Sequence, residues 1–142
     1  MNIMQKQVQD FHDACGITIG NCPEIRDKDL RVSLITEESN ELVDALNKND
    51  IVGAIDGMCD LIYVVMGTAV AMGIDLEPFY NEVHFTNMLK TIGPKRADGK
   101  QLKPANWEPP RIKLILDTQM SITFSGAGYD TPSLFNRDGY GK

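Results

Sequence analysis

The sequence has few of the features that mark zinc proteins, disulfide-bonded domains or nucleic-acid-binding proteins. Its three cysteines, Cys15, Cys22 and Cys59, are odd in number and form no CxxC pair, which argues against zinc and indicates reduced thiols in a cytosolic compartment. Basic residues number 14 against 20 acidic ones, giving a net charge of −6. That charge disfavours attraction to a nucleic-acid backbone, so we expect no nucleic-acid polymer as a partner.

Histidines are scarce as well, and their neighbours exclude one class of metal protein. A di-iron carboxylate bundle needs Glu three residues before His on two of its helices. The residues three positions before His12 and His84 are Gln9 and Asn81, so the sequence does not carry that motif. We interpret both histidines as packing or surface residues.

The chain also lacks a long apolar run. Residues 61–74 are uncharged, but the stretch is shorter than the ~20 residues that a membrane-spanning helix needs. We therefore expect a buried core helix there and no membrane association. The N-terminal stretch MNIMQKQVQDFHDA is polar and amphipathic, unlike a secretory signal, which favours a cytoplasmic protein.

What the chain does have is a helical pattern, in a length of 142 residues that suits one domain. Four segments place apolar residues at helical spacing, and their short connections predict an all-α fold with a four-helix-bundle-like core. The third segment is apolar nearly all round beyond Asp60, which favours the centre of the bundle. The predicted helices cover residues 2–14, ended near Gly16; 27–47, with Asp27 as N-cap; 51–72, with Asp50 as N-cap; and 76–90, with Asp75 as N-cap.

After residue 90 the composition no longer supports a long helix. The stretch TIGPKRADGKQLKPANWEPP contains several Gly and Pro residues and an Asp98–Gly99 turn signal, so we predict an irregular loop. Beyond it, a high content of Gly, Ser and Thr favours extended segments or a mobile tail. We therefore divide the chain into a helical domain, residues 1–117, and an extension, residues 118–142, that is weakly structured or packs on a partner subunit.

The stretch LITEESNEL sets three acids into an otherwise apolar helix face. At about 100° per residue, Glu37 and Glu41 lie about 40° apart, and Glu38 turns towards the apolar arc. Asp56 and Asp60 share one face of the next helix. Acids that face inward need a cation or a proton, and an all-oxygen ligand set favours Mg²⁺, with Mn²⁺ as the alternative. The competing interpretation is a solvated, Glu-rich face.

Local positive charge follows the helices. Against the single acid Asp98 stand five cations, Lys90, Lys95, Arg96, Lys100 and Lys103. A basic loop after a bundle that holds metal ions suits a polyphosphate, bridged by Mg²⁺ on one side and gripped by Lys and Arg on the other. The alternative is a loop that is charged only for solubility.

Four blocks occur in order: EExxE, DLIYVVMGTAVAMGID, EVHFTNMLK and DGKQLKPANWEPP. Together they resemble the all-α nucleoside triphosphate pyrophosphohydrolases, in the MazG-like or phosphoribosyl-ATP-pyrophosphatase-like branch common in bacteria and phages. The resemblance covers roughly residues 1–117 and implies cleavage between the α and β phosphates of a nucleotide, with Mg²⁺ as cofactor. It also implies a location in a bacterial or phage-infected cytoplasm. Relatives form dimers or tetramers with the site between different chains, so we expect a homo-oligomer.

The resemblance also assigns residues. Glu37, Glu38 and Glu41 match the EExxE acids, and Asp60 matches the final Asp of the family's ExxD. The Glu of ExxD falls at Gly57, so Asp56, one position earlier, is the candidate fourth ligand. We take Glu38 as the candidate general base that also shares the metal. The predicted substrate-binding residues are Asn87, Lys90, Arg96 and Lys103, whereas Trp107 is interpreted as a packing residue.

Substrate preference has the weakest signal in the sequence. Candidates near the base are Asn40, Asn87 and backbone groups around Phe11. An amide can both donate and accept, which suits guanine or uracil, and a pocket opened by small residues such as Gly57 and Gly67 could take a purine. We therefore expect purine nucleoside triphosphates, with dGTP or GTP favoured. The alternative function is a non-catalytic nucleotide-binding or regulatory protein of the same fold, because Gly57 departs from the motif. A purely structural bundle is the other alternative, although Leu at position 38 would stabilise it better than Glu38.

Overall fold

The computed structural model describes residues 1–125, which are predominantly helical. Its elements are α1 (Ile3–Cys15), α2 (Lys28–Asn47), α3 (Ile51–Ala71), α4 (Glu77–Met88), the 3-10 helix η1 (Leu89–Ile92) and α5 (Ile112–Ser125). The all-α prediction is confirmed, and α1 to α4 are the four predicted helices. The expectation of extended chain is wrong up to residue 125, because α5 forms there and crosses the predicted domain boundary after residue 117. Residues 126–142 of the predicted extension lie outside the described residues.

Helix ends follow the capping signals with two exceptions, at Asp27 and at α4, whose N-cap position is Leu76 and not the predicted Asp75. The Asn2 side chain accepts a hydrogen bond from the first turn of α1, and Gly16 ends that helix in the left-handed conformation, with φ of 65°. Asp50 accepts from two backbone N–H groups of α3, and Asp75 accepts from the N–H of Glu77. Asp27 does precede α2, but its φ is 49° and its side chain makes no capping hydrogen bond within the described chain. Its predicted capping role is therefore wrong.

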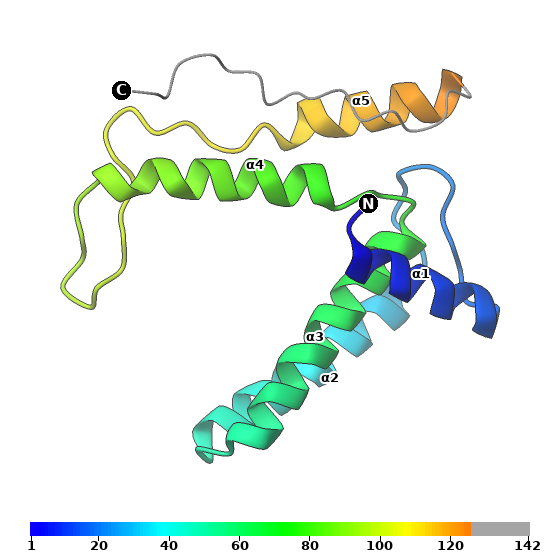
Figure 1. Cartoon of the computed structure of the whole chain (residues 1–142), viewed down its shortest axis with the longest axis horizontal. Helices are drawn as coiled ribbons and strands as arrows, with labels where there is room; N and C mark the ends of the chain where they lie inside the picture. The colour runs from blue at the N-terminus through cyan, green and yellow to red at the C-terminus, as the bar shows by residue number, and fades with distance from the viewer. Residues whose placement is uncertain (126–142) are drawn as a thin grey trace.

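α2 and α3 form a long helical hairpin, and α1 crosses one end of α3 (Figure 1). The two hairpin helices approach closely at Gly57, where a Cβ atom would stand only 3.0 Å from the Cα of Leu42. Within residues 1–125, α4 packs on η1 and α5 and makes no contact with α2 or α3. The helices therefore form two parts, α1 to α3 and α4 to α5, and do not close into one bundle within the chain.

α3 is less buried than its composition suggests. Its buried positions are small residues and one valine, including Ala54, Gly57 and Ala71, whereas Ile55 and Ile62 are 52% and 47% exposed. The prediction of a buried core helix is thus wrong for the single chain, because the small residues make the close contacts and the large ones point outward. By length and composition alone α3 could also cross a membrane, a test that core helices of soluble proteins pass too.

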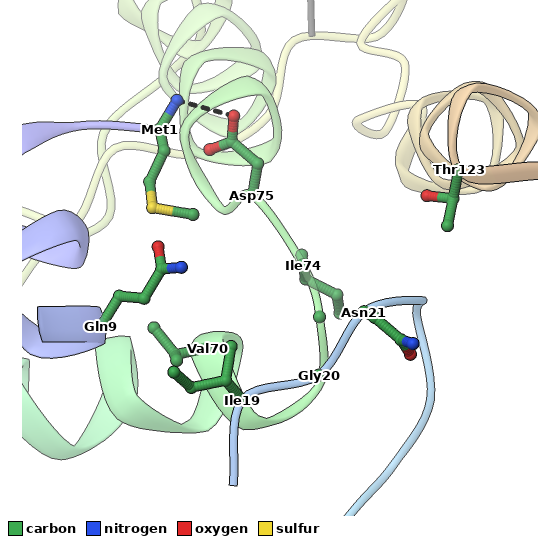
Figure 2. A pocket seen from close by; sticks show the side chains of 10 residues that line it. Met1, Gln9, Ile19, Gly20, Asn21, Val70, Ile74, Asp75 and Thr123 are labelled. Atoms are coloured by element: carbon green, nitrogen blue, oxygen red, sulfur yellow. Dashed lines mark hydrogen bonds and ion pairs between the residues drawn. The ribbon is translucent and has the colours of Figure 1, made fainter. Parts of the chain in front are cut away.

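The two parts meet at the link between α3 and α4. A pocket of about 440 Å³ opens there, and Figure 2 shows Gln9 of α1, Val70 of α3 and Thr123 of α5 around it. None of the predicted metal or substrate residues lines this pocket. It is therefore a feature of the joint rather than of the predicted site.

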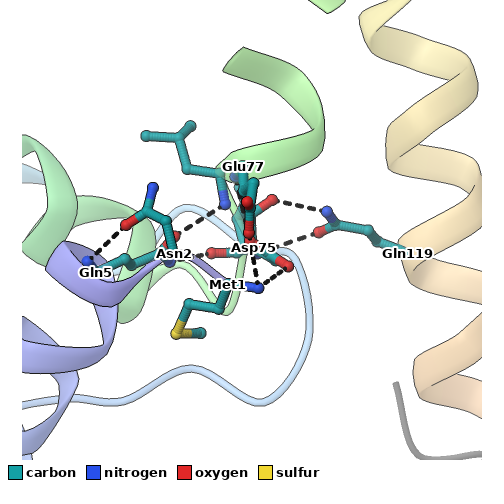
Figure 3. Close-up of polar contacts among 8 residues, drawn as sticks. Met1, Asn2, Gln5, Asp75, Glu77 and Gln119 are labelled. Atoms are coloured by element: carbon teal, nitrogen blue, oxygen red, sulfur yellow. Dashed lines mark hydrogen bonds and ion pairs between the residues drawn. The ribbon is translucent and has the colours of Figure 1, made fainter. Parts of the chain in front are cut away.

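Two buried glutamines hold this link from opposite sides (Figure 3). Gln5 of α1 donates to the carbonyl of Ile74 at 2.6 Å and accepts from the N–H of Leu76 at 3.0 Å. Gln119 of α5 donates to the carbonyl of Asp75 at 2.7 Å and accepts from its N–H at 3.3 Å. Each such bond contributes about 0.5–1.5 kcal/mol. The glutamines therefore fix the direction in which α4 leaves α3.

Candidate functional site

The five predicted metal ligands lie on the two helices of the hairpin. Glu37, Glu38 and Glu41 come from α2, and Asp56 and Asp60 come from α3. The pKa of Glu38 is raised above its ordinary value, first by partial loss of solvent and then by the negative charges of Asp60, Glu41, Glu37 and Asp56. The four other acids thus lie near enough for their charges to act on Glu38, and we call these five residues the acid cluster.

The acid cluster lies at the surface of the hairpin and not in the chain's own core. Glu38 is half-buried, and the other four acids are exposed. The expectation of inward-facing acids is therefore wrong for the single chain, because α4 does not cover the hairpin. Within residues 1–125, no three Asp, Glu, His or Cys side chains lie close enough together to hold a metal ion. The all-oxygen donor set suits a hard cation, but the spacing in one chain is wider than that of a closed site.

The second helix has Gly57 where the resemblance places an acid, and this glycine lies in a close contact between helices. It is buried against Leu42, where a Cβ atom would stand 3.0 to 3.1 Å from Leu42 atoms, so a larger side chain would require α2 to shift. Asp56 is exposed beside it, and its charge contributes to the raised pKa of Glu38. Asp56, the candidate fourth ligand, is thus one of the acids whose charge acts on Glu38.

An aromatic pair joins α1 to the face of α3 that carries Asp56 and Asp60, and its Tyr63 was not among the predicted residues. The rings of Phe11 on α1 and Tyr63 on α3 meet edge to face, with centroids 5.8 Å apart, and the residues are 46% and 41% exposed. Tyr63 follows Asp60 by three residues and Asp56 by seven, which places it on the same face of α3. This helical spacing could have identified Tyr63 as a site residue from the sequence. Exposed rings beside carboxylates can stack on a planar base.

The predicted basic residues divide into two groups. Arg96 forms an ion pair with Asp98, which raises the pKa of the guanidinium and lowers the pKa of the carboxyl. Lys90 donates to Asn87 Oδ1 at 2.6 Å. The Nζ atoms of Lys90 and Lys103 lie 5.1 and 3.9 Å from the centroid of the Trp107 ring. Asn87, Lys90 and Lys103 are therefore neighbours, whereas the Arg96 side chain is engaged within the loop.

The basic loop and the acid cluster belong to different parts of the molecule. The loop follows α4 and η1, and within residues 1–125 neither helix contacts the α2/α3 hairpin (Figure 1). The structure thus brings the five acids together and brings Asn87 and two lysines together. It does not bring one group to the other within a single chain.

Comparison with known proteins adds a family and a relative. The family model described as phosphoribosyl-ATP pyrophosphohydrolase matches residues 9–87, which include Phe11, the acid cluster, Tyr63 and Asn87. An uncharacterized protein of Acanthamoeba polyphaga mimivirus is 46% identical over 48 residues, a segment that makes up 34% of this chain and 19% of that protein. The match therefore spans about a fifth of that relative's length.

Proposed function

The chain belongs to the phosphoribosyl-ATP pyrophosphohydrolase family, and we propose that it is a Mg²⁺-dependent nucleoside triphosphate pyrophosphohydrolase. Family membership points to pyrophosphohydrolase activity in general. In the proposed reaction, water attacks the α phosphorus and the bond from this phosphorus to the oxygen that bridges the α and β phosphates breaks. The products are a nucleoside monophosphate and pyrophosphate. The observation that supports the proposal most directly is the family match over residues 9–87, which include five carboxylates on two adjacent helices.

Four members of the acid cluster are the proposed metal ligands: Glu37, Glu41, Asp56 and Asp60, with Glu38 able to share. The pKa of Glu38 is raised first by partial loss of solvent and then by repulsion from the negative charges of the other acids. A hard divalent cation offsets it with the ligand type that it prefers. Bound Mg²⁺, or Mn²⁺ in its place, would supply charge neutralisation and a more acidic water.

Glu38 is the proposed general base. It is the half-buried member of the acid cluster, and its pKa is raised by partial loss of solvent and by the charges of the neighbouring acids. A carboxylate with a raised pKa accepts a proton from water more readily at neutral pH than an ordinary glutamate does. The other four acids thus tune Glu38 as well as carrying ligand oxygens.

A second copy of the chain is proposed to complete the site. The lysines that suit phosphates lie on the part formed by α4 and the following loop, away from the acid cluster. The α2/α3 hairpin exposes large apolar side chains, among them Val52, Ile55 and Ile62, that a partner could cover. We therefore propose a homodimer or homotetramer in which Asn87, Lys90 and Lys103 of one copy face the acids of another.

The base is proposed to stack on Phe11 and Tyr63, which lie beside Asp60 on the exposed face. A purine offers the larger ring surface to such a pair. Amide groups such as those of Asn40 and Asn87 suit the mixed edge of guanine. These features support purine substrates, with dGTP or GTP preferred.

A nucleotide screen with Mg²⁺ or Mn²⁺, followed by chromatography of the products, tests the proposal. We expect monophosphate and pyrophosphate from purine triphosphates, and no turnover by Asp60→Asn or Glu41→Gln. Equal kcat/KM for all four bases would refute the purine preference and leave the reaction class standing. Nucleotides that raise the melting temperature without being hydrolysed would instead favour a non-catalytic binding protein.

A further inference from the structure

Two lysine ammonium groups lie against one aromatic ring, at Trp107. The Nζ atom of Lys103 is 3.9 Å from the ring centroid and that of Lys90 is 5.1 Å from it. A ring face attracts a cation at such distances through its electron-rich π system. Neither lysine forms an ion pair with an acid in the part of the chain that the structure describes, and the hydrogen bond of Lys90 goes to the neutral Asn87 amide. Two cations are thus held together without an anion.

Trp107 joins segments that the chain separates. Its indole N–H donates to the carbonyl of Thr86 on α4 at 2.8 Å, which fixes the ring against the helix. Lys90 belongs to η1 and approaches the ring from that side, whereas Lys103 comes from the loop beyond the Asp98–Gly99 turn. The ring is therefore the element that brings the two ammonium groups to one place.

Arg96 makes a contrast with this pair. Its guanidinium is bound by both carboxylate oxygens of Asp98, and Asp98 also accepts from the N–H of Lys100. These contacts close the turn of the basic loop, whose ends are linked by the bridge between Lys95 and Gln101. The charge of Arg96 is thus already neutralised inside the loop.

We propose that Trp107 is a positioning residue that holds Lys90 and Lys103 as a polyphosphate-binding pair, and that Arg96 takes no part in it. The ligand class is an anion with two or more adjacent charges, such as the β and γ phosphates of a triphosphate. Holding both side chains on a ring removes part of the rotamer entropy that long lysines lose on binding. The inference rests on the proposed function for its natural ligand, although it can be tested without turnover.

Calorimetric titration of the metal-free, full-length protein with inorganic tripolyphosphate is the direct test. Lys90→Met and Lys103→Met should each weaken binding by about tenfold, because each removes a charge-assisted contact. Trp107→Leu should weaken it about fivefold, and Trp107→Phe, which keeps an aromatic face, by about twofold. In the Lys90→Met/Lys103→Met background, Trp107→Leu should cause no further loss, because the ring acts only through the lysines.

Two controls separate positioning from folding and from net charge. Lys113→Met removes an exposed lysine that pairs with Asp117 on α5, and Arg96→Met with Asp98→Asn removes an ion pair at constant net charge. Both proteins should bind tripolyphosphate as the wild type does. Melting temperature and circular dichroism check each Trp107 variant, and Trp107→Phe keeps the test open should Trp107→Leu unfold the loop.

Three results would overturn the inference. They are wild-type affinity in Trp107→Leu, an equal loss from Trp107→Leu with and without the lysines, and a tenfold loss in the Arg96 and Asp98 control. A different result would refute the proposed function: no nucleotide in the screen is hydrolysed, while the variants still show the expected affinities for tripolyphosphate. Hydrolysis with no effect of Trp107 on the KM for triphosphate would leave the function standing and refute the positioning role.

Discussion

Two inactive variants should restore each other when their subunits mix, because the acid cluster and the lysine pair lie in different parts of the chain. One variant is Asp60→Asn, which removes a proposed metal ligand. The other is Lys90→Met/Lys103→Met, which removes the proposed phosphate contacts. If each site takes its acids from one copy and its lysines from another, a mixed dimer holds one site with both defects and one site with neither.

The size of the recovery follows from symmetry. In a dimer that holds one copy of each variant, one of the two sites is intact, so purified mixed dimers are expected to show about half of the wild-type rate. A tetramer made of two such dimers gives the same fraction. A site built within one chain gives no recovery, because every copy then carries a defect in its own site.

The assay is pyrophosphate release after the two proteins, carrying different affinity tags, are co-expressed and purified through both tags. Each parent alone sets the background, and wild-type chains that carry the two tags set the scale. Wild type paired with a chain that carries all three substitutions should be inactive, because each of the two shared sites then has one defect. Mixed dimers that contain both tags but turn over no faster than the parents would refute a site shared between copies. The proposed reaction would survive that result, since wild-type turnover does not depend on it.

Further predictions concern stability and assembly. The folded-state pKa of Glu38 is raised from 4.5, so metal-free wild type should lose stability as pH rises from about 4.5 through the folded pKa, and Glu38→Gln should lack this component of the unfolding profile. Mg²⁺ at about a hundred times its Kd should raise the wild-type melting temperature by about 8 °C, but leave Asp60→Asn unchanged. Light scattering at micromolar concentration should report a dimer or tetramer, and Ile55→Asp with Ile62→Asp should yield smaller species. Arg31 is 7% exposed, and its Nε and Nη2 atoms form no hydrogen bond within residues 1–125. The Arg31→Met protein should therefore have a higher melting temperature than the wild type. A lower melting temperature would show that the Arg31 charge is neutralised in the assembly.

Local signals predicted the helices well because they act over a few residues. Asn2, Asp50 and Gly16 end or begin helices through hydrogen bonds and backbone conformations within one turn. The acids could be grouped for the same reason, since spacing on two adjacent helices fixes which faces they share. Tyr63 could have been added by the same rule, because it continues the face of Asp56 and Asp60.

Long-range features were harder to predict. α5 contains Thr and Ser residues that lower its helix propensity, and its position depends on Gln119, whose amide bonds the link between α3 and α4. The partition of the basic residues likewise depends on Trp107, which reaches back to the carbonyl of Thr86. Neither contact follows from periodicity, because each joins residues that are far apart in the sequence.

The all-round apolar character of α3 predicts burial, but it does not say which chain does the burying. In the single chain the small residues of α3 face α2 and α1, and Ile55 and Ile62 face outward beside the acid cluster. A second copy that covers this surface would also remove solvent from the carboxylates and increase their repulsion. Bound Mg²⁺ relieves that repulsion, so metal binding and subunit association are expected to be coupled. By linkage each must then strengthen the other by the same factor, and a subunit dissociation constant that is indifferent to Mg²⁺ would separate the acid cluster from the interface.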